Sequence, residues 1–472
     1  MLRGMLLLPG IVLLVVLDLY DAAPGEDIVE TLPGLKNQPR FKHYSGYLNA
    51  SGTKRLHYWF MESQNDPKSD PVVVWMNGGP GCSSMEGLIT ENGPFLVSPD
   101  GSKLHYNPYS WNMVANVLYL ESPAGVGYSY SQDRNYTTND DETSYNNHLA
   151  LQSFFKKFPE YKKNEFYLTG ESYSGFYLPC LAVRLMNDSN INLKGLAIGN
   201  GLSSLSMNDN SMMYFLHYHT VLGDDEWSML QKYCCNCSKC EFSDPKDAKC
   251  RSLVRIAAQR IFTIGINEYD ILSPCADGAP AMDENGEVIP SHFPSMLFRK
   301  HAFSHAWRKS GQMRNRLGLD SPCTNTSRMA RFMNNPAVRK ALHIEPGLPA
   351  WVDCSDDVHR NFVWQYEDMR AQHLSLLKTK KYRILLYNGD QDMMCNYLGD
   401  QWFVESLQQK LLKSYHPWYY EDKHEGRQIG GFVKYFTNLS FLTLKGAGHM
   451  SPKNKPQPAF YMITHFLKNQ PF

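Results

Sequence analysis

The sequence has no excess of charge of either sign. Its 472 residues include 47 lysines and arginines and 47 aspartates and glutamates, so the formal net charge is +0. A protein that holds nucleic acid or an anionic membrane through its overall electrostatics needs a broad basic surface, which this composition does not provide. We therefore expect no nucleic-acid partner.

Long hydrophobic runs are also missing. The N-terminal run from Met5 to Leu17 is shorter than the roughly 20 residues that a membrane-spanning helix needs. Arg3 precedes this run and the small residues Ala22 and Ala23 follow it, as in a cleaved signal peptide. We predict a signal peptide over residues 1–22, with a membrane anchor as the alternative, and no membrane span after cleavage.

A convincing metal-ligand set is lacking, although the chain has 11 cysteines. Several cysteines gather between Cys234 and Cys250, but no neighbouring histidine completes a zinc site there. Adjacent cysteines suit disulfides in an oxidising compartment better. N-glycosylation sequons support the same secretory route, at Asn49, Asn135, Asn187, Asn236, Asn325 and Asn438. We expect no metal and no cofactor.

Internal repeats and low-complexity tracts are absent, and 43% of the residues are hydrophobic, enough for a large core. Several apolar runs end in glycine-rich or polar turns, as the strands of a doubly wound, mostly parallel sheet do. These runs are residues 72–76, 117–120, 195–198, 384–387 and 441–444, with helical patterns such as 145–158 and 401–412 between them. The pattern predicts an α/β fold whose active site lies beyond the carboxyl ends of the strands.

Residues 205–323 have a different character. They hold most of the cysteines, a polar stretch over 277–290 and a basic run from Arg299 to Arg316. We interpret this segment as a disulfide-rich cap inserted into one α/β core, whose two parts are residues 23–204 and 324–472. The basic run is most simply a solvated helix or loop, and an exposed one would also be a site of proteolytic cleavage.

The hexapeptide Gly170–Gly175 is the strongest candidate for catalysis. It places Ser172 between a strand-like run and a helix-like run, as in the nucleophile elbow of α/β-hydrolases. By itself the pattern is weak, because Ser174 stands where the last glycine of the motif belongs, and an ordinary strand-to-helix turn is the alternative. Glu171 is unexpected, because a carboxylate beside a nucleophile disfavours a developing oxyanion.

Two further strand ends supply the partners that such a serine needs. A hydrolase of this chain order requires an acid and then a histidine downstream, and Asp390 and Asp392 follow one strand, while His449 follows the last. The glycine-rich loop Asn77–Gly81 follows an earlier strand and is a candidate oxyanion hole. Its donors would be the backbone N–H groups of Gly79 and Tyr173. A purely structural glycine turn is the alternative for this loop.

These motifs together resemble the serine carboxypeptidases. The resemblance extends over nearly the whole mature chain and rests on residues 75–84, 107–112, 121–127, 170–173, 388–392 and 446–449. Residues 44–47, the Cys234-Cys235 pair and residues 323–326 look closest to the lysosomal members of that family. The resemblance implies an α/β-hydrolase fold with an inserted cap.

The resemblance also implies a role for each site residue. Ser172 would be the nucleophile, His449 the general base and acid, and Asp392 the residue that orients the imidazole, with Asp390 as the alternative acid. The C-terminal carboxylate of the substrate would be recognised by Asn77, Glu91 and Glu171, buttressed by Trp75. A protonated glutamate can bind that carboxylate without repulsion, which gives Glu171 a reason and predicts peptide cleavage at acidic pH.

The family further implies four disulfides and a zymogen cleaved within the cap. The implied pairs are Cys82–Cys354, Cys234–Cys250, Cys235–Cys240 and Cys275–Cys323. Cys395 resembles a free thiol near the substrate pocket, and Cys180 and Cys237 either pair with each other or stay free. The basic run Arg299–Arg316 is the candidate processing region.

The favoured function is therefore a lysosomal serine carboxypeptidase that removes C-terminal, preferably hydrophobic, residues from peptides. Secretion is the alternative to the lysosome. An acyltransferase on the same scaffold and a non-catalytic stabilising partner are the competing functions. A lysosomal family member protects β-galactosidase and neuraminidase, so these enzymes are the candidate protein partners, and the resemblance also implies a homodimer.

Overall fold

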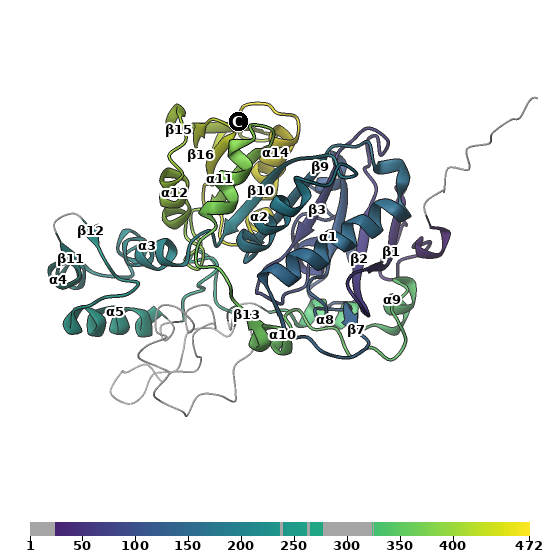
Figure 1. The fold of residues 1–472 in the computed structure, drawn as a ribbon, viewed down its shortest axis with the longest axis horizontal. Helices are drawn as coiled ribbons and strands as arrows, with labels where there is room; N and C mark the ends of the chain where they lie inside the picture. Colours follow the sequence, from purple (N-terminus) through teal and green to yellow (C-terminus); the bar gives the residue numbers. More distant parts are fainter. Residues whose placement is uncertain (1–23, 237–238, 262–264, 277–322, 324) are drawn as a thin grey trace, which may run out of the picture.

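The fold is organised around one large β-sheet. The structure, a computed structural model, describes residues 24–236, 239–261, 265–276, 323 and 325–472 (Figure 1). The strands follow the order β1-β2-β6-β3-β9-β10-β14-β17-β16-β15, with β7 paired to β2. Their bounds are β1 His43–Asn49, β2 Lys54–Met61, β6 Asn116–Leu120, β3 Val72–Met76, β9 Phe166–Ser172, β10 Leu193–Gly201, β14 Arg383–Gly389, β17 Leu439–Leu444, β16 Gly426–Phe436, β15 Leu411–Asp422 and β7 Tyr130–Ser131.

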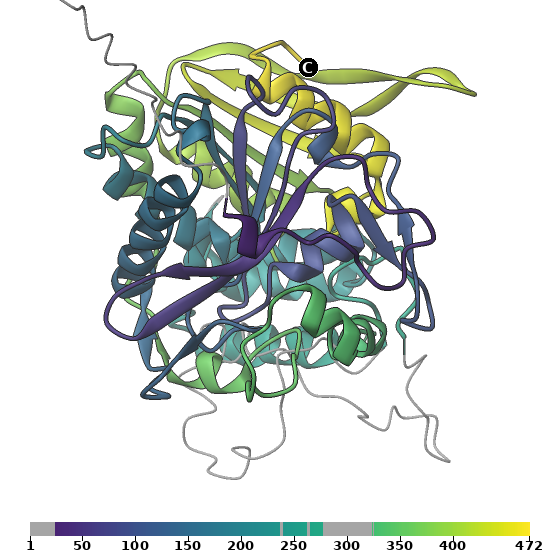
Figure 2. The ribbon, with the colours of Figure 1, turned by 90° about the vertical axis from the view of Figure 1, so that its right-hand side faces the viewer.

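The middle of this sheet is parallel and its flanks are antiparallel. Strands β6, β3, β9, β10, β14 and β17 pair in parallel, while β1, β2, β7, β15 and β16 pair in antiparallel fashion. The central strands are continuous apolar runs because parallel strands are buried on both faces; all five residues of β3, for example, are buried. Figure 2 shows the yellow-green hairpin of β15 and β16 projecting at the top. The predicted doubly wound α/β fold is confirmed.

Helices cover both faces of the sheet and divide the interior into two cores. On one face, Val72 and Val74 pack with residues of α1 (Asp140–Lys157), α2 (Ser174–Leu185) and α11 (Arg370–Lys378). On the other face, Val73 and Trp75 pack with α14 (Pro456–Leu467). The alternation follows from the two-residue period of a strand. It fixes the register of β3 and thereby the position of the loop that follows it.

A separate group of elements lies between β10 and β14, in the segment interpreted above as an inserted cap. It contains α3 (Leu205–Tyr218), α4 (Asp224–Cys234), α5 (Ala248–Ile261) and the short strands β11 (Cys235–Asn236) and β12 (Lys239–Cys240). Figure 1 shows these helices at the left, beside the sheet. Their small core, built around residues such as Phe215 and Trp227, also takes in Met393 and Met394 from the loop after β14. The cap is thus packed onto a loop of the candidate site.

After the cap, shorter elements return the chain to the sheet. Of the described residues, those between the cap and β14 form α8 (Ser327–Met333), α9 (Pro336–Ala341), α10 (Asp356–Asn361), β13 (Phe362–Val363) and α11. The helix α12 (Tyr397–Ser406) follows β14, and α13 (Ser451–Asn454) follows β17. Smaller pieces before the elbow are η2 (Gly87–Glu91), β4 (Phe95–Val97), β5 (Leu104–Tyr106) and β8 (Thr138–Asn139).

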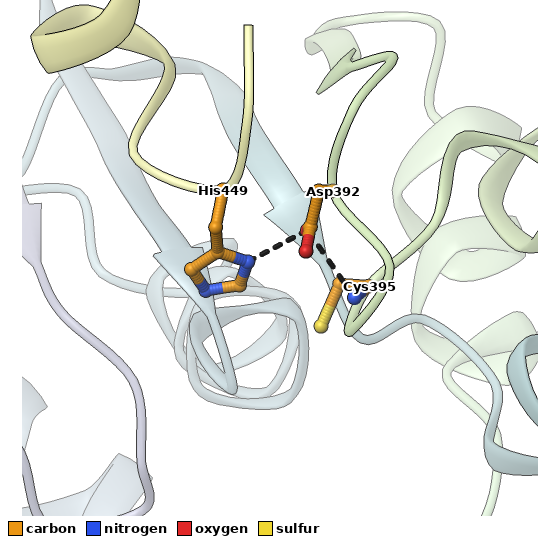
Figure 3. A group of neighbouring side chains, drawn as sticks. All are labelled: Asp392, Cys395 and His449. Atoms are coloured by element: carbon orange, nitrogen blue, oxygen red, sulfur yellow. Dashed lines mark hydrogen bonds and ion pairs between the residues drawn. The ribbon is translucent and has the colours of Figure 1, made fainter. Parts of the chain in front are cut away.

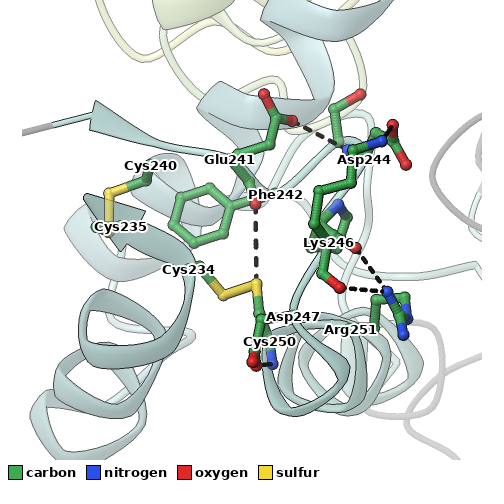
Figure 4. The surroundings of a disulfide bond; sticks show 12 residues. Cys234, Cys235, Cys240, Glu241, Phe242, Asp244, Lys246, Asp247, Cys250 and Arg251 are labelled. Carbon is green, nitrogen blue, oxygen red and sulfur yellow. Dashed lines mark hydrogen bonds and ion pairs between the residues drawn. A yellow bond between two sulfur atoms is a disulfide. The ribbon is translucent and has the colours of Figure 1, made fainter.

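The structure contains the four disulfides that the resemblance implied. Cys82 bonds to Cys354 and Cys275 to Cys323, and Figure 4 shows the two bonds of the cap, Cys234–Cys250 and Cys235–Cys240. Cys180 and Cys395 are free and buried, so Cys180 does not form the disulfide that was left open for it. Three predictions concern residues that the structure does not describe: the state of Cys237, the signal peptide and the processing region Arg299–Arg316.

The described residues also bear on the predictions of glycosylation and of membrane-spanning segments. The sequon asparagines are exposed at Asn49, Asn135, Asn187, Asn236 and Asn325, whereas Asn438 is half-buried. Within the described ranges, no helix combines the length and the apolar character that crossing a bilayer would require.

Candidate active site

The turn between β9 and α2 has the geometry of a nucleophile elbow. Ser172 ends β9 with φ = 61°, a left-handed conformation that is strained for a side chain other than glycine. A Cβ atom at Gly170 would lie 2.2 Å from the carbonyl oxygen of Met76, and one at Gly175 would lie 2.5 Å from that of Leu202. Only glycine fits at these two positions, so close packing on both sides holds Ser172 in its conformation.

Ser174, the departure from the elbow motif, is accommodated in this turn. Its hydroxyl donates to the carbonyl oxygen of Met76 at 2.7 Å. The buried polar group is therefore satisfied, and the substitution leaves the turn intact.

The structure brings Asp392 and His449 together. His449 Nδ1 lies 2.7 Å from Asp392 Oδ2, in a fully buried position for the aspartate (Figure 3). Burial lowers the pKa of His449, but the adjacent Asp392 carboxylate outweighs it, and the net pKa lies above the ordinary value. The imidazolium form is thus stabilised next to the serine elbow, as general-base catalysis requires.

Asp390, the alternative acid, is hydrogen-bonded to groups other than His449. Its Oδ1 accepts hydrogen bonds from the backbone N–H of Gly446 at 2.7 Å and from Gln391 Nε2 at 2.9 Å. It ties the loop after β14 to the loop after β17. Of the two acids at this strand end, Asp392 is the one hydrogen-bonded to His449.

Cys395 lies between the nucleophile and the acid–histidine pair. Its sulfur, an Asp392 oxygen and a His449 nitrogen lie within 4.8 Å of one another. Burial and then the charge of Asp392 raise the pKa of the Cys395 thiol well above its usual value. A metal ligand would have to be a thiolate, so this cluster fits catalysis better than metal binding.

The loop after β3 presses against the elbow. A Cβ atom at Gly78 would lie 2.3 Å from the backbone nitrogen of Tyr173 and 2.8 Å from the Ser172 Cβ. Gly79 has φ = 110°, which favours glycine. The disulfide at Cys82 joins this loop to Cys354, 272 residues away in the chain. Both candidate oxyanion-hole residues, Gly79 and Tyr173, therefore belong to backbone segments in direct contact.

Asn77 connects the predicted carboxylate-binding residues to one another. Trp75 Nε1 donates to Asn77 Oδ1 at 2.7 Å, and Asn77 Nδ2 donates to Glu171 Oε1 at 2.9 Å. The tryptophan fixes which end of the amide faces the glutamate. Glu91 and Glu171 are 2% and 3% exposed, and both Glu91 oxygens and the Oε2 atom of Glu171 are buried without a hydrogen-bond partner among the described residues.

The two glutamates favour their protonated forms. Burial is the largest cause of the raised pKa of each, and the charges of the neighbouring carboxyl groups add to it. Two neighbouring buried carboxyl groups cannot both ionise without a large energetic cost. The pair therefore keeps at least one proton up to a pH well above the ordinary pKa of a glutamate. A protonated carboxyl is a hydrogen-bond donor, which is what a carboxylate ligand needs.

Glu86 is a third carboxyl at this site that sequence reasoning missed. Its Oε2 lies 3.4 Å from Asn77 Nδ2, and its charge contributes to the raised pKa values of both Glu91 and Glu171. The segment Gly87–Glu91 is a π-helix, in which residues five apart lie on one face. The spacing of Glu86 and Glu91 is the signal that could have revealed it, but a π-turn is seldom recognisable from sequence.

A segment of the cap lies directly on the histidine loop. The ring of Tyr269 meets the His449 imidazole edge to face with centroids 4.9 Å apart, and the Tyr269 carbonyl accepts the His449 backbone N–H at 2.6 Å. Asp270 Oδ2 accepts from Asn454 Nδ2 at 3.0 Å. Sequence reasoning did not predict that Tyr269 and Asp270 contact the histidine loop.

We predict that the protein loses stability as the pH rises through neutrality. Burial raises the pKa of Glu268 and of Asp400 to about 7. Groups of this kind stabilise the fold at pH values below their unfolded-state pKa near 4, and the contribution is lost as the pH rises through about 7. Burial lowers the pKa of His43 and His373 to about 4, which opposes this trend only below about pH 6.5.

The melting temperature should therefore fall by about 2 °C between pH 6.5 and pH 8.5, with most of the fall below pH 8. Circular dichroism melts across that range measure it. Asp400→Asn and Glu268→Gln should each flatten the dependence, because neither new side chain ionises. A melting temperature that rises towards pH 8.5 would contradict this account.

Comparison with known proteins agrees with this geometry. A family model described as serine carboxypeptidase matches residues 33–469. The chain is 50% identical over 456 residues to the lysosomal protective protein of Mus musculus, covering 96% of each. It is 41% identical over 464 residues to a serine carboxypeptidase of Caenorhabditis elegans, covering 96% of this chain and 95% of that protein. A prohormone-processing carboxypeptidase of Saccharomyces cerevisiae shares the fold, with a TM-score of 0.72 at 22% identity over 94% of this chain and 96% of that one.

Proposed function

Since the chain belongs to the serine carboxypeptidase family, we propose that its hydrolytic activity is carried by Ser172, His449 and Asp392. Ser172 is the nucleophile on the strained elbow. His449 is the general base and acid, and Asp392, hydrogen-bonded to Nδ1, holds the imidazole in one orientation. The backbone N–H groups of Gly79 and Tyr173 are the proposed donors to the oxyanion.

The reaction proceeds through an acyl-enzyme. The Ser172 oxygen attacks the last peptide carbonyl while His449 Nε2 takes the hydroxyl proton, and the oxyanion is held by the two backbone donors. His449 then gives that proton to the leaving amine, and the C-terminal amino acid departs as the C–N bond breaks. A water molecule, deprotonated by His449, then attacks the acyl-enzyme ester. The ester C–O bond breaks as His449 returns this proton to the Ser172 oxygen, which releases the shortened peptide.

One observation carries the restriction to free C-termini: the buried pair of Glu91 and Glu171 next to the elbow, whose pKa values burial raises. Together with the Asn77 amide, this pair offers donors to a carboxylate placed one residue beyond the scissile bond. Trp75 supports the site by holding Asn77. The raised pKa values favour binding in acidic solution, and Met450, beside His449, fits a hydrophobic leaving residue.

The decisive experiment compares free and C-terminally amidated forms of the same peptides at pH 4.5 and pH 7.5. We expect single-residue release from free termini at acidic pH, abolished by a serine-reactive phosphonate, and weak action on the amides that rises with pH as the His449 imidazole loses its proton. Mass spectrometry identifies the products. Internal cleavage, or release that the phosphonate leaves untouched, would contradict the proposal.

We place the protein in the lysosome, reached through the secretory pathway after removal of residues 1–22. The predicted signal peptide, the disulfides, the exposed sequons and the acid-adapted carboxyl pair support this location. Cleavage of a zymogen within the cap and glycosylation at the sequons belong to the same proposal. Gel mobility before and after glycosidase treatment and reduction tests both.

A second, non-catalytic role is favoured by one comparison. The mouse relative carries the name lysosomal protective protein, and we propose by analogy a homodimer that also stabilises β-galactosidase and neuraminidase. A Ser172→Ala protein that prolongs the half-lives of both enzymes at acidic pH would establish this role separately from catalysis. Half-lives equal to those without the protein would refute it.

A further inference from the structure

We propose that Asn200 is a positioning residue that holds the Asp392 carboxylate towards His449 through the orientation of its buried amide. This inference rests on the proposed triad and adds a fourth side chain to it. Asn200 touches no substrate, and it acts only through Asp392.

The position of Asn200 in the sheet explains why a side chain is needed there. Strand β10 lies between β9, which ends at Ser172, and β14, which leads into Asp392. The nucleophile and the acid are thus separated by one strand. The register of β10 against β9 shifts between Gly199 and Gly201, so Asn200 is the extra residue of a bulge. A bulge at a strand end re-aims one side chain, and the φ of 41° at Asn200 belongs to the same distortion.

The contacts of Asn200 show where its side chain is aimed. Asn200 Nδ2 donates to Asp392 Oδ2 at 2.9 Å, on the oxygen that also accepts from His449 Nδ1. The remaining donors to this carboxylate are the backbone N–H groups of Met394 at 2.9 Å and Cys395 at 3.2 Å. Those two donors come from the same loop as Asp392 and move with it. Asn200 is therefore the side-chain donor that anchors the carboxylate to a neighbouring strand.

The orientation of the amide is fixed by its other end. Asn200 Oδ1 accepts the backbone N–H of Gly389 at 3.0 Å and the hydroxyl of Ser451 at 2.9 Å. A backbone N–H can only donate, so the atom facing Gly389 is the oxygen and the NH₂ group faces Asp392. Ser451 lies two residues after His449, so the same amide also ties the acid to the histidine loop.

An aspartate at position 200 tests the need for a donor. One carboxyl oxygen would still accept from Gly389 and Ser451, and the other would face Asp392 Oδ2 at hydrogen-bonding distance. Two carboxyl groups in this arrangement can share a proton but repel each other when both are ionised. The other titratable groups around this position are His449, Glu171, Asp400, Glu268 and Cys395.

The experiment measures kcat on an ester substrate without a terminal carboxylate, so that the glutamate pair does not enter the pH profile. Relative to wild type, we expect Asn200→Leu to lose about 10- to 100-fold at pH 4.5 and pH 7.5 alike. Asn200→Asp should stay within about 5-fold of wild type at pH 4.5 and fall to the level of Asn200→Leu at pH 7.5, with KM unchanged in both variants.

Asn388→Asp is the matched control. Asn388 is another buried amide at this sheet edge, and it donates to Asp400 at 3.0 Å rather than to Asp392. Its variant should lower the melting temperature without the pH-dependent rescue of kcat. If Asn200→Asp follows the wild-type profile at a constant ratio, or Asn200→Leu stays within about 3-fold of wild type, the inference is wrong. Ester hydrolysis that survives in Ser172→Ala would instead show that the proposed triad itself is wrong.

Discussion

Replacing Ser172 by alanine should lower kcat by about 10⁴- to 10⁶-fold while changing KM little, because the substrate still binds but no acyl-enzyme forms. The strained backbone at Ser172 and the hydrogen-bonded Asp392–His449 pair support this result. Steady-state cleavage of a free-terminus peptide and covalent labelling by a phosphonate measure it. Both signals should disappear together.

Two neighbouring residues supply the controls for this prediction. Ser174→Ala removes a hydroxyl that is engaged with the Met76 carbonyl, so labelling should persist and stability should fall by about 1 kcal/mol. Asp390→Asn should retain most activity, whereas Asp392→Asn should lose about 10⁴-fold, since only Asp392 is hydrogen-bonded to His449. Equal losses in the two aspartate variants would mean that the acid has been wrongly assigned.

Replacing Glu171 by glutamine should free peptide cleavage from much of its pH dependence. The raised pKa of the Glu91–Glu171 pair means that a proton is present at acidic pH and is lost as the pH rises through that raised value. Once both groups are ionised, they repel the substrate's terminal carboxylate. Glutamine carries no charge and donates from its NH₂ group at every pH, so kcat/KM at pH 9 relative to pH 6 should rise about 10-fold or more over the same ratio in wild type.

The effect should appear in KM and only with substrates that carry the charge. Amidated peptides and esters should show the same pH profile in wild type and Glu171→Gln. Glu165→Gln is a matched control, because Glu165 directly precedes the start of the same strand, β9, and bonds to Tyr167 instead of Asn77. An unchanged peptidase pH profile in Glu171→Gln would remove the basis for acid-dependent substrate binding.

Much of the site could be read from local sequence because it lies at strand ends. The apolar runs before Asn77, Ser172, Asp392 and His449 are short and end in glycine-rich turns, and parallel strands bring such ends to one edge. Glu171 could also be singled out from local sequence, because a carboxyl group beside a nucleophile needs an explanation. The resemblance then assigned Asp392 over Asp390, a choice that the chain's own spacing left open.

Other parts of the site lay beyond local sequence. The sequence around Asn200 does not indicate that its amide donates to Asp392, 192 positions later. The bulge that orients this amide exists only when β9 and β10 are paired. Glu86 joins the glutamate pair only through the π-turn after it, and Tyr269 contacts His449 only because its segment packs on the loop after β17.

The sequence by itself thus determined the α/β class, the order of the triad and the chemistry expected of Ser172. Periodicity, turn residues and chain order are local properties, and each acts on its own stretch of chain. The tertiary structure decided which carboxyl groups have raised pKa values, which acid is hydrogen-bonded to His449 and which amide donates to that acid. Burial and close contacts between distant segments set those properties, since a pKa or a hydrogen bond depends on every group that packing brings within a few ångströms.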